Sequence, residues 1–331
     1  MRGAAGRGFL LAKMYGTIAR SYLGANFRDL LRLKSLADLQ ALLWPSGDAE
    51  AHAALPAAEI EGHIGRDALA AMRSVLEYLE EPDAILVHLF RKAEYQNLKV
   101  VLRGMAEGRV ETSRLQDLGG YAGLPLDGVT DFEKAIKASP YSWTLAARKA
   151  ASRARLENMI DRDYYIELSK LAKALPAPGR TGILRYVRLE ISVTNAVWAL
   201  RLRFSFGMDE VSARPLFVPG LGGTARRAVA RSFEIPPDAL DEWRRWPFGW
   251  LLADQFGEAF RSPDPIRAEA VASQRLYVRA HQLLHQYPLT LCPVVAYFVL
   301  KQREAALLKT AVEMLALGMP EKELLALVGE R

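Results

Sequence analysis

Apolar residues recur every three or four positions along most of the chain, as they do in helices that bury one face. The spacing is clearest at 67–80, 162–175 and 303–318. No stretch alternates apolar and polar residues with the period of two that marks a strand. The pattern therefore predicts an all-α protein. Gly- and Pro-rich breaks separate the helical stretches at 118–128, 175–182, 215–223 and 261–265.

The stretch EYQNLKVVLRGMAEG, residues 94–108, is one of these predicted helices and contains an unexpected amide. Its apolar positions form one stripe, and Gly108 follows as a residue that can end a helix in the left-handed conformation. Asn97 lies at the edge of the stripe, although its short amide competes with the helix backbone for hydrogen bonds. Because buried amides are usually hydrogen-bonded within the protein, we interpret Glu94 and Asn97 as structural residues, with Asn97 bonding a neighbouring helix.

This helix has two counterparts further along the chain, at 192–207 and 304–318. Asn97 aligns with Asn195 and with Leu307, and a glycine ends each of the three stretches. Further glycines follow each helix end at similar distances. The loss of the amide in the last stretch argues against a ligand shared by all three.

A second match lies upstream of each helix. Glu61 begins the pattern E-x-x-I-x-R-D, Glu157 repeats that pattern in full, and the last segment keeps only Glu269. Since order and spacing hold over three segments roughly 100 residues apart, we infer an internal repeat and call its members the first, second and third copy. Seven residues form the repeat signature: Glu61, Glu94, Asn97, Glu157, Asn195, Glu269 and Glu304.

Charge is unevenly distributed over the 331 residues. The whole chain carries +6, whereas segment 141–232 alone holds sixteen basic and seven acidic residues, a net +9. Such a segment fits an acidic protein partner, an anionic lipid surface or a nucleic acid, and equally a solvated arginine-rich helix surface. The sequence leaves these alternatives open.

Two features of the sequence indicate the redox state of its compartment and argue against a membrane-spanning segment. The single Cys292 excludes an intrachain disulfide and is typical of a reducing compartment. The longest apolar run, 287–300, is shorter than the ~20 residues of a membrane span and contains two prolines. We expect no transmembrane segment.

The sequence offers no catalytic constellation, and we expect no cofactor and no metal. His281 and His285 have the i, i+4 spacing of zinc ligands on a helix, but the zincin glutamate is replaced by Gln282 and no third ligand lies nearby. Stretch 242–250 combines three tryptophans and a phenylalanine with two arginines. We interpret it as packing at a junction, with a protein, membrane or nucleic-acid interface as the alternatives.

With its repeats in order, the chain resembles the C subunit of archaeal and bacterial V/A-type rotary ATPases, which is related to the eukaryotic vacuolar d subunit. Segment 11–43 resembles that family's opening helix, and EYQNLKVVLR at 94–103 its acidic-x-x-Asn-Leu-Lys helix. LEISVTNAVWALR at 189–201 resembles a second such helix, and 297–324 the closing Lys-x-x-Glu helix with its glycine. Two positions depart from the usual family pattern, Ser192 for Asp and Leu307 for Asn.

The resemblance implies three similar helical domains in a pseudo-threefold, funnel-shaped arrangement, which we place at 1–115, 116–217 and 218–331. It also implies a non-catalytic central-stalk subunit, present once per complex. Such a subunit lies peripherally on the cytoplasmic face of the membrane, between the D and F shaft subunits and the proteolipid ring, and links ATP hydrolysis or synthesis to H⁺ or Na⁺ transport. No nucleic acid is expected as a partner.

A socket for a charged shaft needs accessible charges of its own. We expect cations on the polar faces of the glycine-terminated helices to line it: Lys99, Arg103, Arg201, Arg203 and Lys309. The alternative from another functional class is a free-standing helical scaffold that binds an acidic partner such as RNA through the basic segment 141–232.

Overall fold

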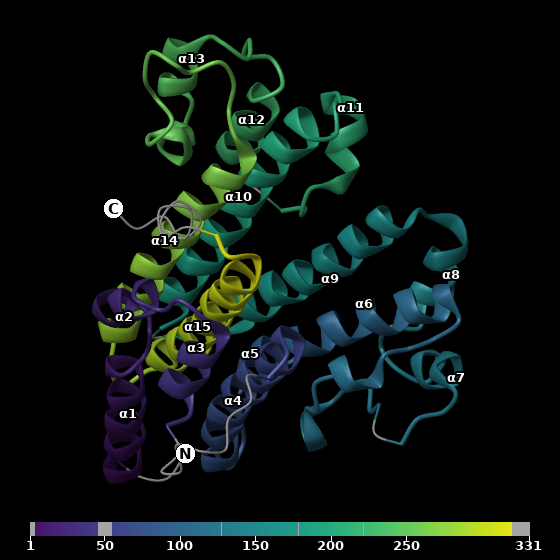
Figure 1. Ribbon diagram of the computed structural model, residues 1–331, viewed down its shortest axis with the longest axis vertical. Helices are drawn as coiled ribbons and strands as arrows, with labels where there is room; N and C mark the ends of the chain where they lie inside the picture. The colour runs from purple at the N-terminus through teal and green to yellow at the C-terminus, as the bar shows by residue number, and fades with distance from the viewer. Residues whose placement is uncertain (1–3, 46–54, 127, 178, 221, 320–331) are drawn as a thin grey trace. The chain divides into compact units, whose positions relative to one another are not determined.

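The computed structural model describes residues 4–45, 55–126, 128–177, 179–220 and 222–319. All regular secondary structure in these ranges is helical, which confirms the predicted all-α class (Figure 1). The α-helices are α1 Ala4–Ala19, α2 Phe27–Leu31, α3 Leu36–Leu43, α4 Ala57–Tyr78, α5 Ala84–Phe90, α6 Lys92–Glu107, α7 Phe132–Lys137, α8 Trp143–Ala150, α9 Arg153–Ala174, α10 Arg180–Phe204, α11 Glu210–Ala213, α12 Gly223–Arg231, α13 Leu240–Arg245, α14 Pro265–His285 and α15 Cys292–Leu317.

The lengths of the long helices follow the internal repeat. The first helix of each copy, α4, α9 or α14, has 22, 22 or 21 residues. The second helix is α10 with 25 residues in the second copy and α15 with 26 in the third. In the first copy it is interrupted at Arg91 into α5 and α6. Each copy therefore contributes one long helical pair.

The described residues form two compact units. Those up to residue 164 and from residue 284 onward make the first unit, and those from 165 to 283 make the second. The division falls inside α9 and α14, so these units do not follow the borders of the repeat. The arrangement of three domains at 1–115, 116–217 and 218–331 stays a prediction.

Helix α15 forms the centre of the first unit. Every residue from 292 to 300 is buried, so this part of the apolar run 287–300 is covered by protein, whereas Tyr287 and Leu289 before it are exposed. Helix α15 packs against α1, α3, α4 and α5, and Figure 1 shows it in yellow beside α4 and α5. Pro293 lies in the first turn, where its missing N–H costs no helical hydrogen bond. Among the described helices none is long and apolar enough to cross a bilayer.

The core of the second unit contains the aromatic stretch 242–250. The rings of Trp243 and Trp246 are buried against residues of α10, α12 and α14. Each indole N–H has a backbone acceptor, with Trp243 donating to the Pro236 carbonyl at 2.9 Å and Trp246 to the Ala228 carbonyl at 2.7 Å. Arg244 and Arg245 are exposed. The two tryptophans therefore pack in the core of this unit, and their role at a junction between copies stays a prediction.

Two helices end as the sequence predicts, at glycines in the left-handed conformation. Gly108 caps α6 with φ 80° and Gly318 caps α15 with φ 63°. After Gly108 the chain turns back over its own helix, so that the Arg109 N–H donates to the Gly104 carbonyl at 2.8 Å. A Cβ on Gly104 would lie 2.6 Å from the Arg109 oxygen and from the Val110 Cα. The glycine at 104 is needed for this close approach of backbone to backbone.

We predict that Gly104→Ala lowers the free energy of unfolding by about 1–3 kcal/mol, because the new methyl group meets backbone that cannot rotate away. Gly16→Ala is the matched control, since Gly16 lies on the exposed side of α1 with open space around its Cα. There the higher helix propensity of alanine is expected to leave stability unchanged or raise it by up to about 1 kcal/mol. Chemical denaturation followed by circular dichroism measures both, and equal stability of the two variants would contradict the prediction.

Candidate functional site

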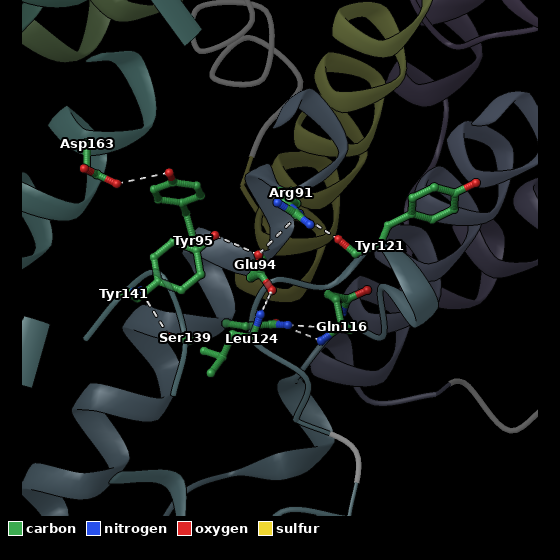
Figure 2. Close-up of polar contacts among 10 residues, drawn as sticks. Arg91, Glu94, Tyr95, Gln116, Tyr121, Leu124, Ser139, Tyr141 and Asp163 are labelled. Atoms are coloured by element: carbon green, nitrogen blue, oxygen red, sulfur yellow. Dashed lines mark hydrogen bonds and ion pairs between the residues drawn. The ribbon is translucent and has the colours of Figure 1, made fainter. Parts of the chain in front are cut away.

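The buried carboxylate of Glu94 lies at the centre of a polar network in the first unit. Figure 2 shows it between Arg91, Tyr141 and the backbone of Leu124. The Tyr141 hydroxyl donates to Oε2 at 2.7 Å, the Leu124 amide donates to Oε1, and the Arg91 Nε lies 4.0 Å from Oε2. The side chain has no exposed surface. One carboxylate thus joins α6 to the loop at 124 and to the residues before α8.

The phenol of Tyr141 stays a hydrogen-bond donor in this network. Burial, followed by the negative charge of Glu94, raises the pKa of Tyr141 well above its ordinary value. Arg91 holds a second loop, because its Nε donates to the Tyr121 carbonyl at 2.7 Å. All these partners are internal, which makes the network structural.

Asn97 forms a two-way bracket with the backbone of one loop residue. Its Nδ2 donates to the Gln116 carbonyl at 2.7 Å, and its Oδ1 accepts from the Gln116 N–H at 2.8 Å. Asn195 makes the same bracket with Val218, at 3.0 and 2.8 Å. The amide of Asn97 thus bonds within the protein, and its partner is the loop that follows its own helix. The expected neighbouring helix is not the partner.

The third copy has no asparagine bracket and makes a different polar contact. Leu307 is buried and apolar at the bracket position. Glu304 takes the place of Glu94, and its Oε1 accepts from the Tyr22 amide at 2.9 Å while its Oε2 pairs with Lys301. The contact with Tyr22 ties α15 to the segment between α1 and α2. Gly329, the counterpart of the loop glycines, lies outside the described residues.

Three of the predicted socket cations form ion pairs with the next long helix. The Lys99 Nζ lies 2.5 Å from the Asp161 Oδ1, and the Arg103 Nη2 lies 3.1 Å from the Glu157 Oε1. Both pairs join α6 to α9. In the second unit Arg201 of α10 lies 2.5 Å from Glu269 of α14.

The pairs Arg103–Glu157 and Arg201–Glu269 are equivalent in the repeat. Each joins the second helix of one copy to the signature glutamate that begins the next copy. Burial of the Glu157 carboxyl opposes its charged form, but the hydrogen bonds from Arg103 and Arg153 outweigh it and lower the pKa of Glu157. The third copy lacks the cation of this pair, because the acidic Glu313 occupies the position of Arg103.

The other two predicted cations differ from each other. Arg203 donates to the Ser232 carbonyl and lies over the ring of Phe204, with its Cζ 4.7 Å from the ring centroid. Lys309 is half-buried on α15 and has no ion pair with any residue of the described ranges. Four of the five cations thus have internal partners, and their role in a shaft socket stays a prediction.

The two histidines with the spacing of zinc ligands each lie against a tyrosine ring. His285 stacks on Tyr15 with ring centroids 5.3 Å apart, and His281 contacts Tyr277 at 5.9 Å. Within the part of the chain that the structure describes, no three potential metal ligands cluster. Cys292 is buried at the start of α15.

The repeat itself contains a signal for the paired arginines, which the prediction of a socket overlooked. Arg103 and Arg201 align in the repeat, and so do Glu157 and Glu269, so two opposite charges recur at matched places. Repetition of both partners is the pattern expected of a contact between successive copies. The exposed cations Arg28 and Lys34 carry no such signal.

The comparison with known families agrees with the resemblance seen in the sequence. A family model described as ATP synthase (C/AC39) subunit matches residues 11–327. The chain belongs to this family. Membership confirms the expected class, a non-catalytic subunit of an ATPase complex.

Individual relatives of this ATP synthase (C/AC39) family member are distant. An uncharacterized protein of Treponema pallidum is 24% identical over 90% of this chain and 89% of its own length. The C subunit of the A-type ATP synthase of Halobacterium salinarum is 27% identical over 73% of this chain and 72% of its own length. The protein of the same name from Thermococcus onnurineus is 26% identical over 53% of this chain, and the match spans 46% of that relative.

We predict that Asn195→Leu lowers the free energy of unfolding by about 2 kcal/mol or more, because the N–H and carbonyl of Val218 lose their partners in a buried site. Ser192→Ala is the control on the same helix, since the Ser192 hydroxyl bonds only the Arg188 carbonyl one turn earlier. It should change stability by less than about 0.5 kcal/mol. Urea denaturation tests the pair, and an Asn195→Leu protein as stable as Ser192→Ala would refute the bracket.

We predict that Tyr141→Phe destabilises the protein by about 1–3 kcal/mol, because Oε2 of the buried Glu94 loses its closest donor. Tyr287→Phe is the matched control, since Tyr287 is 53% exposed. Thermal unfolding of the two variants at neutral pH measures the difference. Identical melting temperatures would show that the carboxylate does not depend on Tyr141.

Proposed function

We propose that this chain is the central-stalk subunit that joins the D–F shaft of a V/A-type ATPase to the proteolipid ring. The observation that carries the proposal is the family match over residues 11–327, which leaves almost none of the chain for another function. In this role one copy per complex lies on the cytoplasmic face of the membrane and touches the bilayer only through the ring. Rotation of the shaft then passes through the chain to ion translocation.

A torque-bearing spacer must resist bending at its helix ends, and the polar contacts of this chain suit that requirement. Glu94, Asn97 and Asn195 each fix a loop to a helix through hydrogen bonds that are shielded from water. Shielded hydrogen bonds are stronger than exposed ones, because water does not compete for the partners. The Arg103–Glu157 and Arg201–Glu269 pairs add contacts between successive copies.

Electrostatics supports a protein partner over RNA. Four arginines of the basic segment are held by nearby carboxylates, in the pairs Arg153–Glu157, Arg201–Glu269, Arg214–Glu210 and Arg231–Glu242. Paired cations release fewer counterions on binding a phosphate backbone, which weakens nucleic-acid affinity. The net +9 of 141–232 fits an RNA scaffold as well as a protein partner, but these ion pairs neutralise part of that charge and favour the protein partner.

We predict that a complex lacking this chain hydrolyses ATP without pumping ions, because the catalytic head keeps its shaft but the shaft no longer drives the ring. Membrane vesicles from a deletion strain, assayed for ATPase activity and for ATP-driven ion uptake, provide the measurement. Adding back the purified chain should restore uptake. Unchanged coupling in the deletion strain, or isolation of the chain with RNA and without ATPase subunits, would contradict the proposal.

A further inference from the structure

A cleft with cationic walls opens in the first unit at the end of α15. Its volume is about 780 Å³. One side is formed by α2 and the turn after it, and the other by the last turn of α15 with its glycine cap Gly318. Gly318 is the third-copy counterpart of Gly108. The cleft therefore lies at the end of one of the glycine-terminated helices.

The charges around the cleft are less neutralised than those of the predicted socket cations. Arg28 and Lys34 are exposed, and neither side chain has an ion pair with the described residues. Arg32 lies 3.7 Å from Asp29, but both side chains are at least half exposed, so this pair is weak. Asp38 accepts from the Lys34 backbone N–H at 3.0 Å, and this bond, with a smaller contribution from the Lys34 charge, lowers the pKa of Asp38. The carboxylate forms no ion pair with the Lys34 ammonium group, so it neutralises that charge only in part.

The glycine cap occupies acceptors at the helix end that could otherwise attract these cations. The Gly318 N–H donates to the Leu315 carbonyl at 3.2 Å, and the Met319 N–H donates to the Met314 carbonyl at 3.0 Å. These bonds satisfy two of the carbonyls that a helix leaves unpaired at its C-terminus. Among the described residues, Arg28 and Lys34 therefore have no ion-pair partner at this helix end.

The remaining surface of the cleft is apolar. Leu31, Leu33, Leu315 and Met319 contribute to its lining. Leu317, one residue before the cap, is 74% exposed. Apolar lining surrounded by positive charge is complementary to a peptide segment that carries both acidic and apolar side chains. A free phosphate or an inorganic anion would leave the leucines and the methionine without a partner.

We propose that this cleft binds an acidic, apolar-containing segment of the shaft, held by Arg28 and Lys34 over the leucines. This inference rests on the proposed function and adds the place and the chemistry of the contact. It assigns the main electrostatic contribution to cations next to α15 that have no ion pair with the described residues, in place of the ion-paired cations of α6 and α10.

Binding of the full-length chain to the purified D–F shaft subcomplex tests the inference. The double variant R28E/K34E should bind at least roughly tenfold more weakly than the wild type, because charge reversal replaces attraction by repulsion. The defect should be larger at about 50 mM than at about 300 mM salt, where screening is stronger. The charge-preserving variant R28K/K34R should bind within about twofold of the wild type, since the contact is electrostatic.

The control variant is R226E/R227E, which reverses two exposed cations of α12 in the second unit. It has the same change of net charge and should bind like the wild type. Thermal unfolding confirms that both reversed variants are folded. Equal shaft affinity of R28E/K34E and the wild type, or an equal loss in R226E/R227E, would overturn the cleft as the contact.

A second arm separates a lipid surface from the shaft. Vesicles of phosphatidylglycerol and phosphatidylcholine are mixed with the same proteins. In one outcome the wild type binds the vesicles and R28E/K34E does not, while both proteins have equal affinity for the shaft. That result would overturn the inference in favour of a lipid contact. A wild-type chain with no affinity for the shaft would overturn the proposed function and this inference together, whereas a shaft-binding chain that is insensitive to R28E/K34E would overturn only the cleft.

Discussion

Helix α15 can exist in water only if its first nine residues are covered on every side, and the structure of the first unit depends on that constraint. The cover comes from α1, α3, α4 and α5, which are built from the first third of the chain. Polar contacts fix the same arrangement, because the Tyr22 amide donates to Glu304 and the Gln302 side chain donates to the Leu89 carbonyl at 2.6 Å. The last described helix is therefore the core of the unit that the first helices begin.

The polar residues of the repeat act at helix ends and in loops. Asn97 and Asn195 each satisfy both backbone groups of one loop residue, and Glu94 satisfies a loop amide and a phenol. Leaving such groups unpaired inside a protein costs about 1–3 kcal/mol each, so each bracket strongly favours one loop position. These hydrogen bonds hold the loops in place after the helices, as the proposed role of a torque-bearing spacer requires.

The sequence was sufficient for the fold class, the long helices and the repeat, because helical periodicity and glycine stops are local signals. It also located Asn97 as a structural amide, but not its partner, since a backbone group 19 residues away leaves no mark in composition. The polar-face cations were predicted to face a partner, yet Lys99, Arg103 and Arg201 pair with the next long helix, whose position depends on tertiary packing. Arg28 and Lys34 could not be predicted from the sequence, because their place in the cleft depends on the end of α15, which is far from them along the chain.

The central claim is that this chain is the spacer between shaft and ring. An electron cryo-microscopy map of the intact ATPase purified through a tag on this chain tests it most directly. The account predicts one copy of the chain on the rotation axis, with the shaft on one side, the ring on the other, and shaft density over Arg28 and Lys34. A map with the chain on a peripheral stalk, or with no ATPase subunits attached to it, would contradict the account.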